Sequence, residues 1–111
     1  MMKVKTGEDN IRYLLGLTPK QYEMFVKLNE VNENDLSSRE IQSLTGLDAS
    51  VITRTLSVLL KQGLVHREYA LRGDAPPHYR YKTVSEAEFQ SKTILAAEEF
   101  TSKVKKELGR V

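Results

Sequence analysis

The sequence predicts a mainly α fold with a small β-hairpin, an α+β class. Residues 37–63 form two stretches of helical spacing that a glycine separates. Residues 64–84 then change to alternating apolar and polar residues, with a turn-forming tip between two runs. Residues 85–108 return to helical spacing without an interior glycine or proline. These changes of period predict helices on both sides of one hairpin.

Length and composition narrow the class further. The 111 residues suffice for one core, so we expect a single domain, with residues 1–17 as an extension, residues 18–84 as the body and residues 85–111 as a terminal helix. The chain has no cysteine, which excludes a disulfide framework and a thiolate metal site. Its net charge is only +2, and no apolar run approaches membrane-spanning length. We therefore expect a soluble, cytoplasmic protein without a membrane partner.

The first long helix begins at Thr18 and Pro19. Thr18 can cap the helix, Pro19 suits its first position, and Gln21 completes a capping-box spacing. Apolar residues at helical spacing follow at Tyr22, Phe25, Val26 and Leu28. Ahead of this helix, the sequence indicates a short helix or turn that ends at Gly16. Residues 29–35 are polar and turn-forming, so we expect them to connect this helix to the next.

A capping box opens the next helix. Ser37 is followed three residues later by Glu40, a spacing that lets each side chain bind the backbone N–H of the other residue. The spacing predicts a helix over residues 38–45 that buries Ile41 and Leu44.

Glycines delimit the second helix of this pair. Gly46 stands where a left-handed residue is needed to stop the preceding helix and reverse the chain. Asp48 can accept the unpaired N–H groups at the start of the second helix. That helix continues with regular spacing to Lys61 or Gln62, and Gly63 stops it.

The helix over residues 48–62 has one apolar and one polar side. At 100° per residue, Ile52, Leu56 and Leu59 lie close together and should face the core. The opposite side carries small hydroxyl groups and cations, at Ser50, Thr53, Arg54, Ser57 and Lys61. Residues 49–62 include neither Asp nor Glu. Such a side suits close approach to phosphates and base edges, although an ordinary amphipathic helix explains the segment as well.

The hairpin that follows has two predicted strands, over residues 64–69 and 78–84. Two prolines prevent a fully paired ladder in the tip between them, and Arg72 is placed to project from this tip.

Two groups of hairpin side chains raise other functions. His66 and Glu68 would share a strand face and could bind a metal ion. No third ligand stands at an ordered position, so we expect neither a metal, a cofactor nor a catalytic site. Tyr69, Tyr79 and Tyr81 could stack on single-stranded bases, but we expect at least two of them to pack within the hairpin.

The last helix begins with another capping-box spacing, at Ser85 and Glu88. It should run to Leu108, on the order of 35 Å. Its apolar residues recur at threes and fours: Phe89, Ala96, Ala97, Phe100, Val104 and Leu108. Because this length exceeds what one small domain covers, we expect these residues to form a homodimer interface. The other reading is that the helix folds back over its own domain.

The predicted order of elements is that of a winged helix-turn-helix domain. The residues resemble the archaeal TrmB-like and, more loosely, the MarR-like transcriptional regulators, in LGLTPKQYEMF, in SSREIQSLTGLDASVITRTLSVLLKQGLV and in RYKTVS. The resemblance covers residues 15–85. It implies that the helix over residues 48–62, the reader helix, enters the major groove of double-stranded DNA. The hairpin of residues 64–84, the wing, would contact the backbone or the minor groove, and terminal helices would pair two subunits.

The resemblance also implies roles for single residues. Base and groove contacts fall to Ser50, Thr53, Arg54 and Ser57, and backbone or wing contacts fall to Lys61, Arg67, Arg72 and Arg80. The implied function is that of a sequence-specific DNA-binding transcriptional regulator, not an enzyme. No residues remain for the sugar-binding domain of larger TrmB-like regulators, so the resemblance leaves any effector unknown. The alternative is a winged-helix adaptor that binds protein, which Val51 and Val58 beside the polar side favour.

Overall fold

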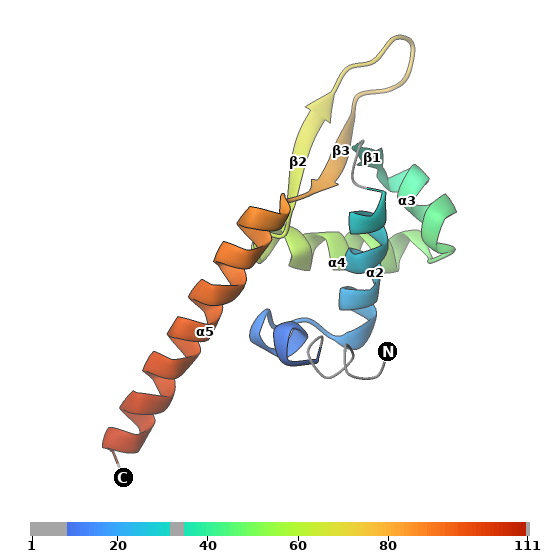
Figure 1. The fold of residues 1–111 in the computed structure, drawn as a ribbon. Helices are drawn as coiled ribbons and strands as arrows, with labels where there is room; N and C mark the ends of the chain where they lie inside the picture. Colours follow the sequence, from blue (N-terminus) through green and yellow to red (C-terminus); the bar gives the residue numbers. More distant parts are fainter. Residues whose placement is uncertain (1–8, 32–34, 111) are drawn as a thin grey trace. The chain divides into compact units, whose positions relative to one another are not determined.

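The computed structural model describes residues 9–31 and 35–110 and divides the chain into two compact units (Figure 1). The terminal unit combines the two ends of the chain, residues 1–19 and 85–111. The central unit comprises residues 20–84. The elements associated with the central unit are α2 (Pro19–Glu30), β1 (Leu36–Ser37), α3 (Ser38–Thr45), α4 (Ala49–Lys61), β2 (Val65–Ala70) and β3 (His78–Thr83). Together with the long helix of the terminal unit, they confirm the predicted mainly α fold with a small sheet.

Helix α2 begins at Pro19, as the sequence predicts, and buries Met24, Phe25 and Leu28. It ends at Glu30, two residues inside the segment expected as a connection. Residues 32–34 of that connection lie outside the described residues.

The capping box of α3 is present in full. The Ser37 hydroxyl accepts the Glu40 backbone N–H at 3.1 Å, and the Glu40 carboxylate accepts the Ser37 backbone N–H at 2.9 Å. Ile41 is fully buried, as predicted, whereas Leu44 is 41% exposed. The expectation for Leu44 is wrong because the helix has only two turns, and its last turn lies at the margin of the core.

The turn between α3 and α4 follows the predicted chemistry with one exception. Gly46 has φ +73°, and its N–H donates to the Gln42 carbonyl at 2.8 Å. Asp48 occupies the N-cap position of α4, but its side chain makes no capping hydrogen bond. Only its backbone carbonyl serves the helix, by accepting the Ile52 N–H at 3.0 Å. The predicted side-chain cap is therefore wrong, and Asp48 contributes only a backbone hydrogen bond to the start of α4.

The far end of α4 closes in a Schellman motif. Gly63 is left-handed, with φ +74°. Its N–H donates to the Leu60 carbonyl at 3.0 Å, and the Leu64 N–H donates to the Leu59 carbonyl at 2.9 Å. This closure turns the chain directly into β2, whose first residue, Val65, is buried.

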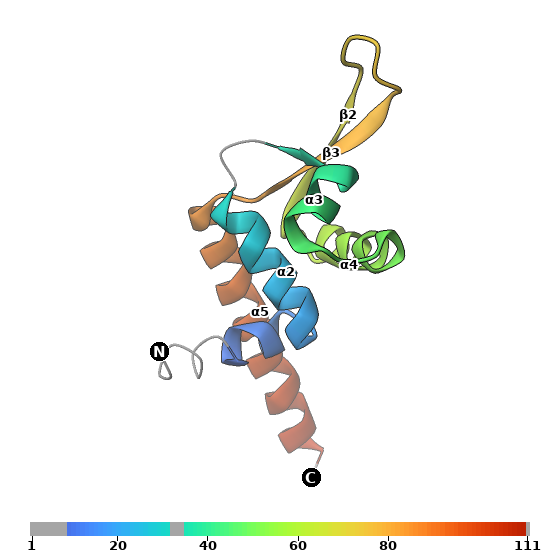
Figure 2. The same ribbon diagram turned by 90° about the vertical axis from the view of Figure 1, so that its right-hand side faces the viewer.

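The sheet has three antiparallel strands in the order β1-β3-β2. In the predicted hairpin, β2 and β3 pair from Val65 opposite Thr83 to Ala70 opposite His78. Strand β1 was not predicted, because two residues are too few to show an alternating pattern. It adds to the outer edge of β3, where Ser37 lies opposite Arg80. Figures 1 and 2 show the hairpin extending away from α3 and α4.

The terminal unit contains a short helical segment over residues 9–14 and α5 (Glu86–Gly109). The Ser85 hydroxyl caps α5 by accepting the Glu88 N–H at 3.1 Å. The rings of Tyr13 and Phe100 meet edge to face, with their centroids 6.3 Å apart. No residue of α5 is buried. In the parts of the chain that the structure describes, no helix combines the length and the apolar character needed to cross a membrane.

Candidate nucleic-acid interface

The polar side of α4 is exposed along its whole length. The core side is buried, with Ile52 1%, Leu56 3% and Leu59 0% exposed. The predicted contact residues on the other side are all exposed: Ser50, Thr53, Arg54, Ser57 and Lys61. Because α4 also lacks acidic residues, this surface offers hydroxyl groups and cations without a competing carboxylate on the helix.

Both cations of this side are available to a ligand. Neither Arg54 nor Lys61 makes an ion pair with any residue that the structure describes. Arg54 lies near the middle of the helix, and Lys61 is its last residue. A central guanidinium flanked by small hydroxyl side chains can approach a flat polar edge closely, and a terminal ammonium can meet a phosphate.

A further cation lies beside this surface and was not predicted. Arg39, in the first turn of α3, is exposed and makes no ion pair among the described residues. It lines a hollow of about 190 Å³ between α3 and α4, together with Ser38, Gln42, Ala49, Ile52 and Thr53. The sequence signal for it was a lone basic residue two positions after the helix cap Ser37, and only the packing of α3 on α4 shows its relation to the reader helix.

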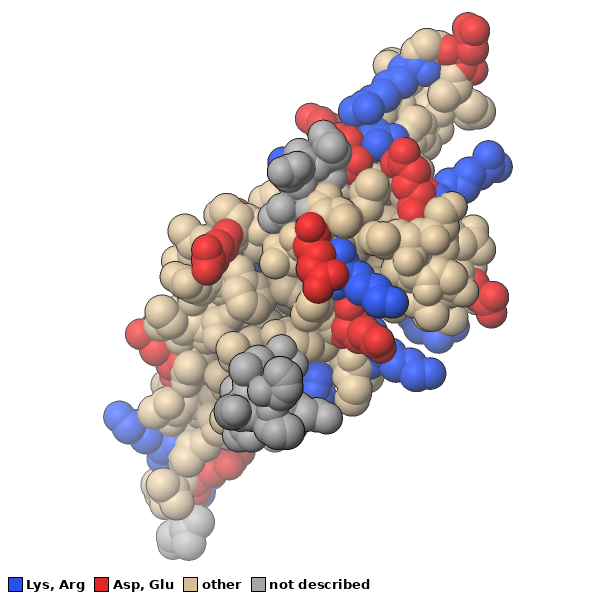
Figure 3. Space-filling view, turned by 45° about the vertical axis from the view of Figure 1, so that its right-hand side comes forward, with Lys and Arg blue, Asp and Glu red and all other residues tan. Residues whose placement is uncertain are grey.

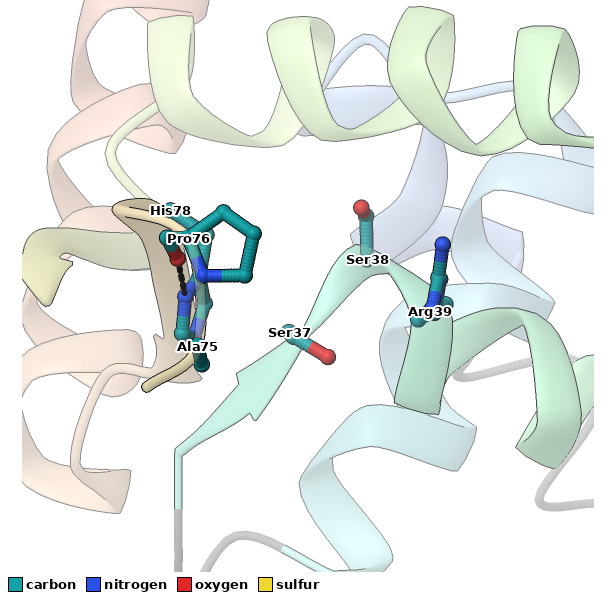
Figure 4. A pocket seen from close by; sticks show the side chains of 6 residues that line it. All are labelled: Ser37, Ser38, Arg39, Ala75, Pro76 and His78. Carbon is teal, nitrogen blue, oxygen red and sulfur yellow. Dashed lines mark hydrogen bonds between the residues drawn. The ribbon is translucent and has the colours of Figure 1, made fainter. Parts of the chain in front are cut away.

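Arg39 also lines a hollow beside the wing. A second hollow, of about 340 Å³, separates the first turn of α3 from the loop at the end of the wing. Figure 4 shows its lining residues, which are Ser37, Ser38, Arg39, Ala75, Pro76 and His78. The His78 ring is held to the wing loop, with Nδ1 2.9 Å from the Pro76 carbonyl oxygen.

The tyrosines of the wing pack on each other, as expected for two of them. Tyr69 lies opposite Tyr79 in the sheet, and their rings meet edge to face with centroids 5.3 Å apart. The Arg67 guanidinium lies over the Tyr79 ring, 4.2 Å from its centroid. Arg67 is exposed, so it presents its charge on the surface of the wing while the ring holds its orientation.

Arg80 lies in a different environment from the exposed one expected for a residue that contacts the DNA backbone. Its side chain is only 12% exposed, and its Nε donates to an Asp35 carboxylate oxygen at 2.8 Å. Its Nη2 donates to the Asp35 carbonyl and to Glu40 Oε1, both at 2.9 Å. The guanidinium is thus bound within the protein. The sequence did not predict this, because the unpredicted strand β1 is what brings Asp35 beside β3.

Asp35, Glu40 and Arg80 form a cluster that also binds Arg72 and shifts the pKa values of its own members. Arg72 Nη2 lies 3.3 Å from Asp35 Oδ2, although 56% of the Arg72 side chain remains exposed. Hydrogen bonding from Arg80 lowers the pKa of Asp35. The Ser37 backbone N–H, followed by Arg80, lowers the pKa of Glu40, and the bond to Asp35 raises the pKa of Arg80. All three groups are therefore charged at neutral pH.

Positive and negative side chains share one face of the protein (Figure 3). On the face drawn in Figure 3, acidic and basic side chains lie interspersed. The net charge of the whole chain is only +2, so we expect DNA contact to depend on particular residues rather than on the total charge.

The residues expected at a dimer interface lie along α5 with graded exposure. Phe89, Ala96, Ala97 and Val104 are half-buried, whereas Phe100 is 47% and Leu108 67% exposed. The sequence did not single out Ile94 and Leu95, which are also more than half exposed. The helix therefore exposes apolar side chains in addition to those of the predicted dimer interface.

Comparison with known proteins places these features in a family. A model of the MarR family matches residues 15–75, more than half of the chain. The chain belongs to the MarR family. As a MarR-family protein, it is a DNA-binding transcriptional regulator, in agreement with the general function expected from the sequence. The MarR-like resemblance is thereby confirmed, and the TrmB-like one stays a prediction.

Solved structures show the same fold. A "possible transcriptional regulator" from Methanosarcina mazei Go1 has a TM-score of 0.80 at 17% identity, over 93% of this chain and 86% of its own. A protein from the archaeon Sulfolobus tokodaii has a TM-score of 0.70 at 19% identity, over 92% and 98%. A mutant of MepR from S. aureus, bound to an oligodeoxyribonucleotide, has a TM-score of 0.62 at 14% identity, over 98% and 75%. A search of curated proteins found no match.

Proposed function

We propose that this MarR-family protein binds double-stranded DNA sequence-specifically, with the reader helix, residues 48–62, in the major groove. The observation that carries the proposal is the polar side of α4, which is exposed, free of acids and built from three hydroxyl residues and two cations that make no ion pair with the residues that the structure describes. A major groove admits one α-helix, and base edges there present distinct patterns of donors and acceptors. The wing, residues 64–84, would contact the backbone or the minor groove.

Arg54 is the residue that we assign to base reading. It lies midway along the exposed side, and Ser50, Thr53 and Ser57 surround it on the same surface. A guanidinium can donate two parallel hydrogen bonds to guanine, which contribute about 1 to 3 kcal/mol of discrimination. The hydroxyl residues are short enough to let the helix approach and can themselves bind bases or phosphates.

Phosphate contacts fall to cations at the margins of this surface. We assign Lys61, Arg67 and Arg72 to the backbone or the wing contact and add Arg39 from the adjoining hollow. Arg80 is left out, because its guanidinium donates to Asp35 and Glu40.

A homodimer joined through α5 completes the proposal. The apolar residues of α5 are unburied in the single chain, including Phe100 and Leu108. A two-fold pair of such chains would place two reader helices in successive major grooves, about 34 Å apart on a palindromic site. This assembly would act in the cytoplasm on the DNA there.

The alternative, a winged-helix adaptor that binds protein, depends on apolar residues beside the reader surface. Val51 and Val58 are the residues that favour it, and both are half-buried, which leaves a partner little continuous apolar surface on α4. The structure of MepR with an oligodeoxyribonucleotide, on the same fold, further supports DNA as the ligand.

Binding to mixed genomic DNA fragments tests the proposal. The protein should retain a subset of fragments at low salt and release them as salt rises, because phosphate contacts displace counterions. Sequencing the retained subset should yield a shared, two-fold symmetric site. Retention of no fragments at low salt, or of all fragments equally, would contradict specific binding.

A further inference from the structure

One cluster of charged side chains joins the wing to the start of α3. Arg80, on β3, donates from Nε to Asp35 Oδ1 at 2.8 Å and from Nη2 to the Asp35 carbonyl at 2.9 Å. The same Nη2 donates to Glu40 Oε1 at 2.9 Å. Glu40 Oε1 in turn accepts the Ser37 N–H of the α3 capping box. A single guanidinium therefore connects β3, the residue before β1 and the first turn of α3.

The cluster also reaches both ends of the wing loop. Arg72, which follows β2, lies 3.3 Å from the second carboxylate oxygen of Asp35. His78, the first residue of β3, lies with Nε2 3.3 Å from Arg80 Nη1. Both ends of the wing loop thereby lie against the same carboxylate and guanidinium, at the end of the hairpin that is farther from the buried Val65 and Thr83.

Among the described residues, β1 is the other element that joins this part of the wing to the body. Strand β1 contributes only two paired residues, Leu36 opposite Tyr81 and Ser37 opposite Arg80. Beyond them, the loop residues 71–77 are all exposed. A two-stranded hairpin is marginally stable by itself, so its orientation depends on whatever attaches it to the rest of the fold.

We propose that Arg80 is a positioning residue for DNA binding, which acts through Asp35 and Glu40 to fix the wing against the start of α3. The cluster would hold Arg67 and Arg72 at the distance and angle from the reader helix that one DNA duplex requires. The role rests on the proposed function, because only DNA binding gives this orientation a use. It differs from the phosphate contact that the sequence suggested for Arg80, in which the guanidinium itself would touch the DNA.

The two roles predict opposite signs for one substitution. Asp35→Asn removes a negative charge and keeps the size of the side chain. If Arg80 contacted phosphate, this change would release its guanidinium and tighten DNA binding. If Arg80 positions the wing, the change weakens the charge-assisted bonds and lowers affinity for DNA, by about three- to thirtyfold. Asp74→Asn is the matched control, because it removes the same charge from an exposed residue of the wing loop that is not in the cluster.

Hydrogen exchange of the protein without DNA gives a second readout. The Asp35→Asn variant should exchange its backbone amides in β2 and β3 faster than the unmodified protein, while those of α4 keep their protection. Arg80→Lys should do the same, because an ammonium keeps the charge but cannot reproduce the planar fork of donors. A phosphate-contacting Arg80 would instead leave the exchange of the wing unchanged in the lysine variant.

The two readouts separate the failure of this inference from the failure of the proposed function. Unchanged wing exchange in both variants, or DNA binding that tightens in Asp35→Asn as in Asp74→Asn, would overturn the positioning role even if the protein binds DNA well. Failure of the unmodified protein to bind any genomic fragment would overturn the proposed function, and the positioning role with it.

Discussion

Phe100→Asp should convert the homodimer that we propose into a monomer. Phe100 is 47% exposed on α5, in the middle of the apolar residues that we assign to the dimer interface. An aromatic side chain buries roughly 150–250 Å² when fully covered. About 90 Å² of Phe100 therefore remains for a second copy to cover, with a contribution of about 2 kcal/mol at 25 cal/mol per Å².

The two-fold symmetry of a dimer doubles this contribution. Each interface residue is used twice, so losing Phe100 removes about 4 kcal/mol, or roughly a thousandfold in the dimer dissociation constant. Placing a carboxylate in the interface adds a desolvation cost to this loss. Sedimentation of both proteins across micromolar concentrations measures the change, and binding to a two-fold site should weaken in parallel.

Two further variants separate dimerisation from damage to the protomer. Phe100 also contacts the Tyr13 ring, so its replacement alters the terminal unit as well. Leu108→Asp, at a residue 67% exposed, should also weaken the dimer. Ser102→Asp adds the same charge at an exposed polar residue of α5 and should leave the dimer intact. An unmodified protein that is monomeric at micromolar concentration would refute the reasoning.

Three further predictions concern the stability of the central unit, and chemical denaturation measures each of them. Ile41→Ala should lower the free energy of unfolding by about 2 to 5 kcal/mol, because this side chain is fully buried. Leu44→Ala should lower it by under about 1 kcal/mol, because Leu44 is 41% exposed. Equal effects of the two substitutions would contradict the difference in burial. Gly46→Ala should cost about 1 to 2 kcal/mol, because φ is +73° while the added methyl group meets only open space, and a neutral effect would contradict the left-handed turn. Because the folded protein lowers the pKa of Asp35 and Glu40, the unfolded chain binds more protons in acid; the stabilisation should be complete above about pH 5 and fall as pH drops below about 4, with a shallower decline in Asp35→Asn.

The sequence predicted best those features that nearby residues determine. The Ser37 and Glu40 capping box, the left-handed Gly46 and the three- and four-residue spacing of buried side chains in α4 all depend on residues within a few positions of one another. Each has a local physical cause, either a hydrogen bond to the adjacent backbone or helical periodicity. The structure therefore shows these features at the predicted positions.

The features that the sequence missed depend on contacts between distant segments. Asp35 and Arg80 are 45 residues apart, and no local pattern relates them. They meet because β1 pairs with β3, and β1 is too short to show a period. The same cause binds Arg80 to carboxylates within the protein, while the packing of α3 on α4 placed Arg39 beside the reader helix. Residue type alone could not distinguish an arginine that binds an internal carboxylate from one that faces a ligand.

The central claim is that the exposed side of α4 reads DNA. It is tested by the binding of the Arg54→Ala variant to the selected site, a duplex that carries the sequence shared by the retained genomic fragments. The account predicts a loss of about 1 to 3 kcal/mol in the preference for the selected site over a scrambled one, with an unchanged melting temperature, because Arg54 is exposed and unpaired among the described residues. Lys27→Ala, which removes the same charge from an exposed residue of α2, should retain the preference. An Arg54→Ala variant that kept both its affinity for the selected site and its preference for that site would contradict the account.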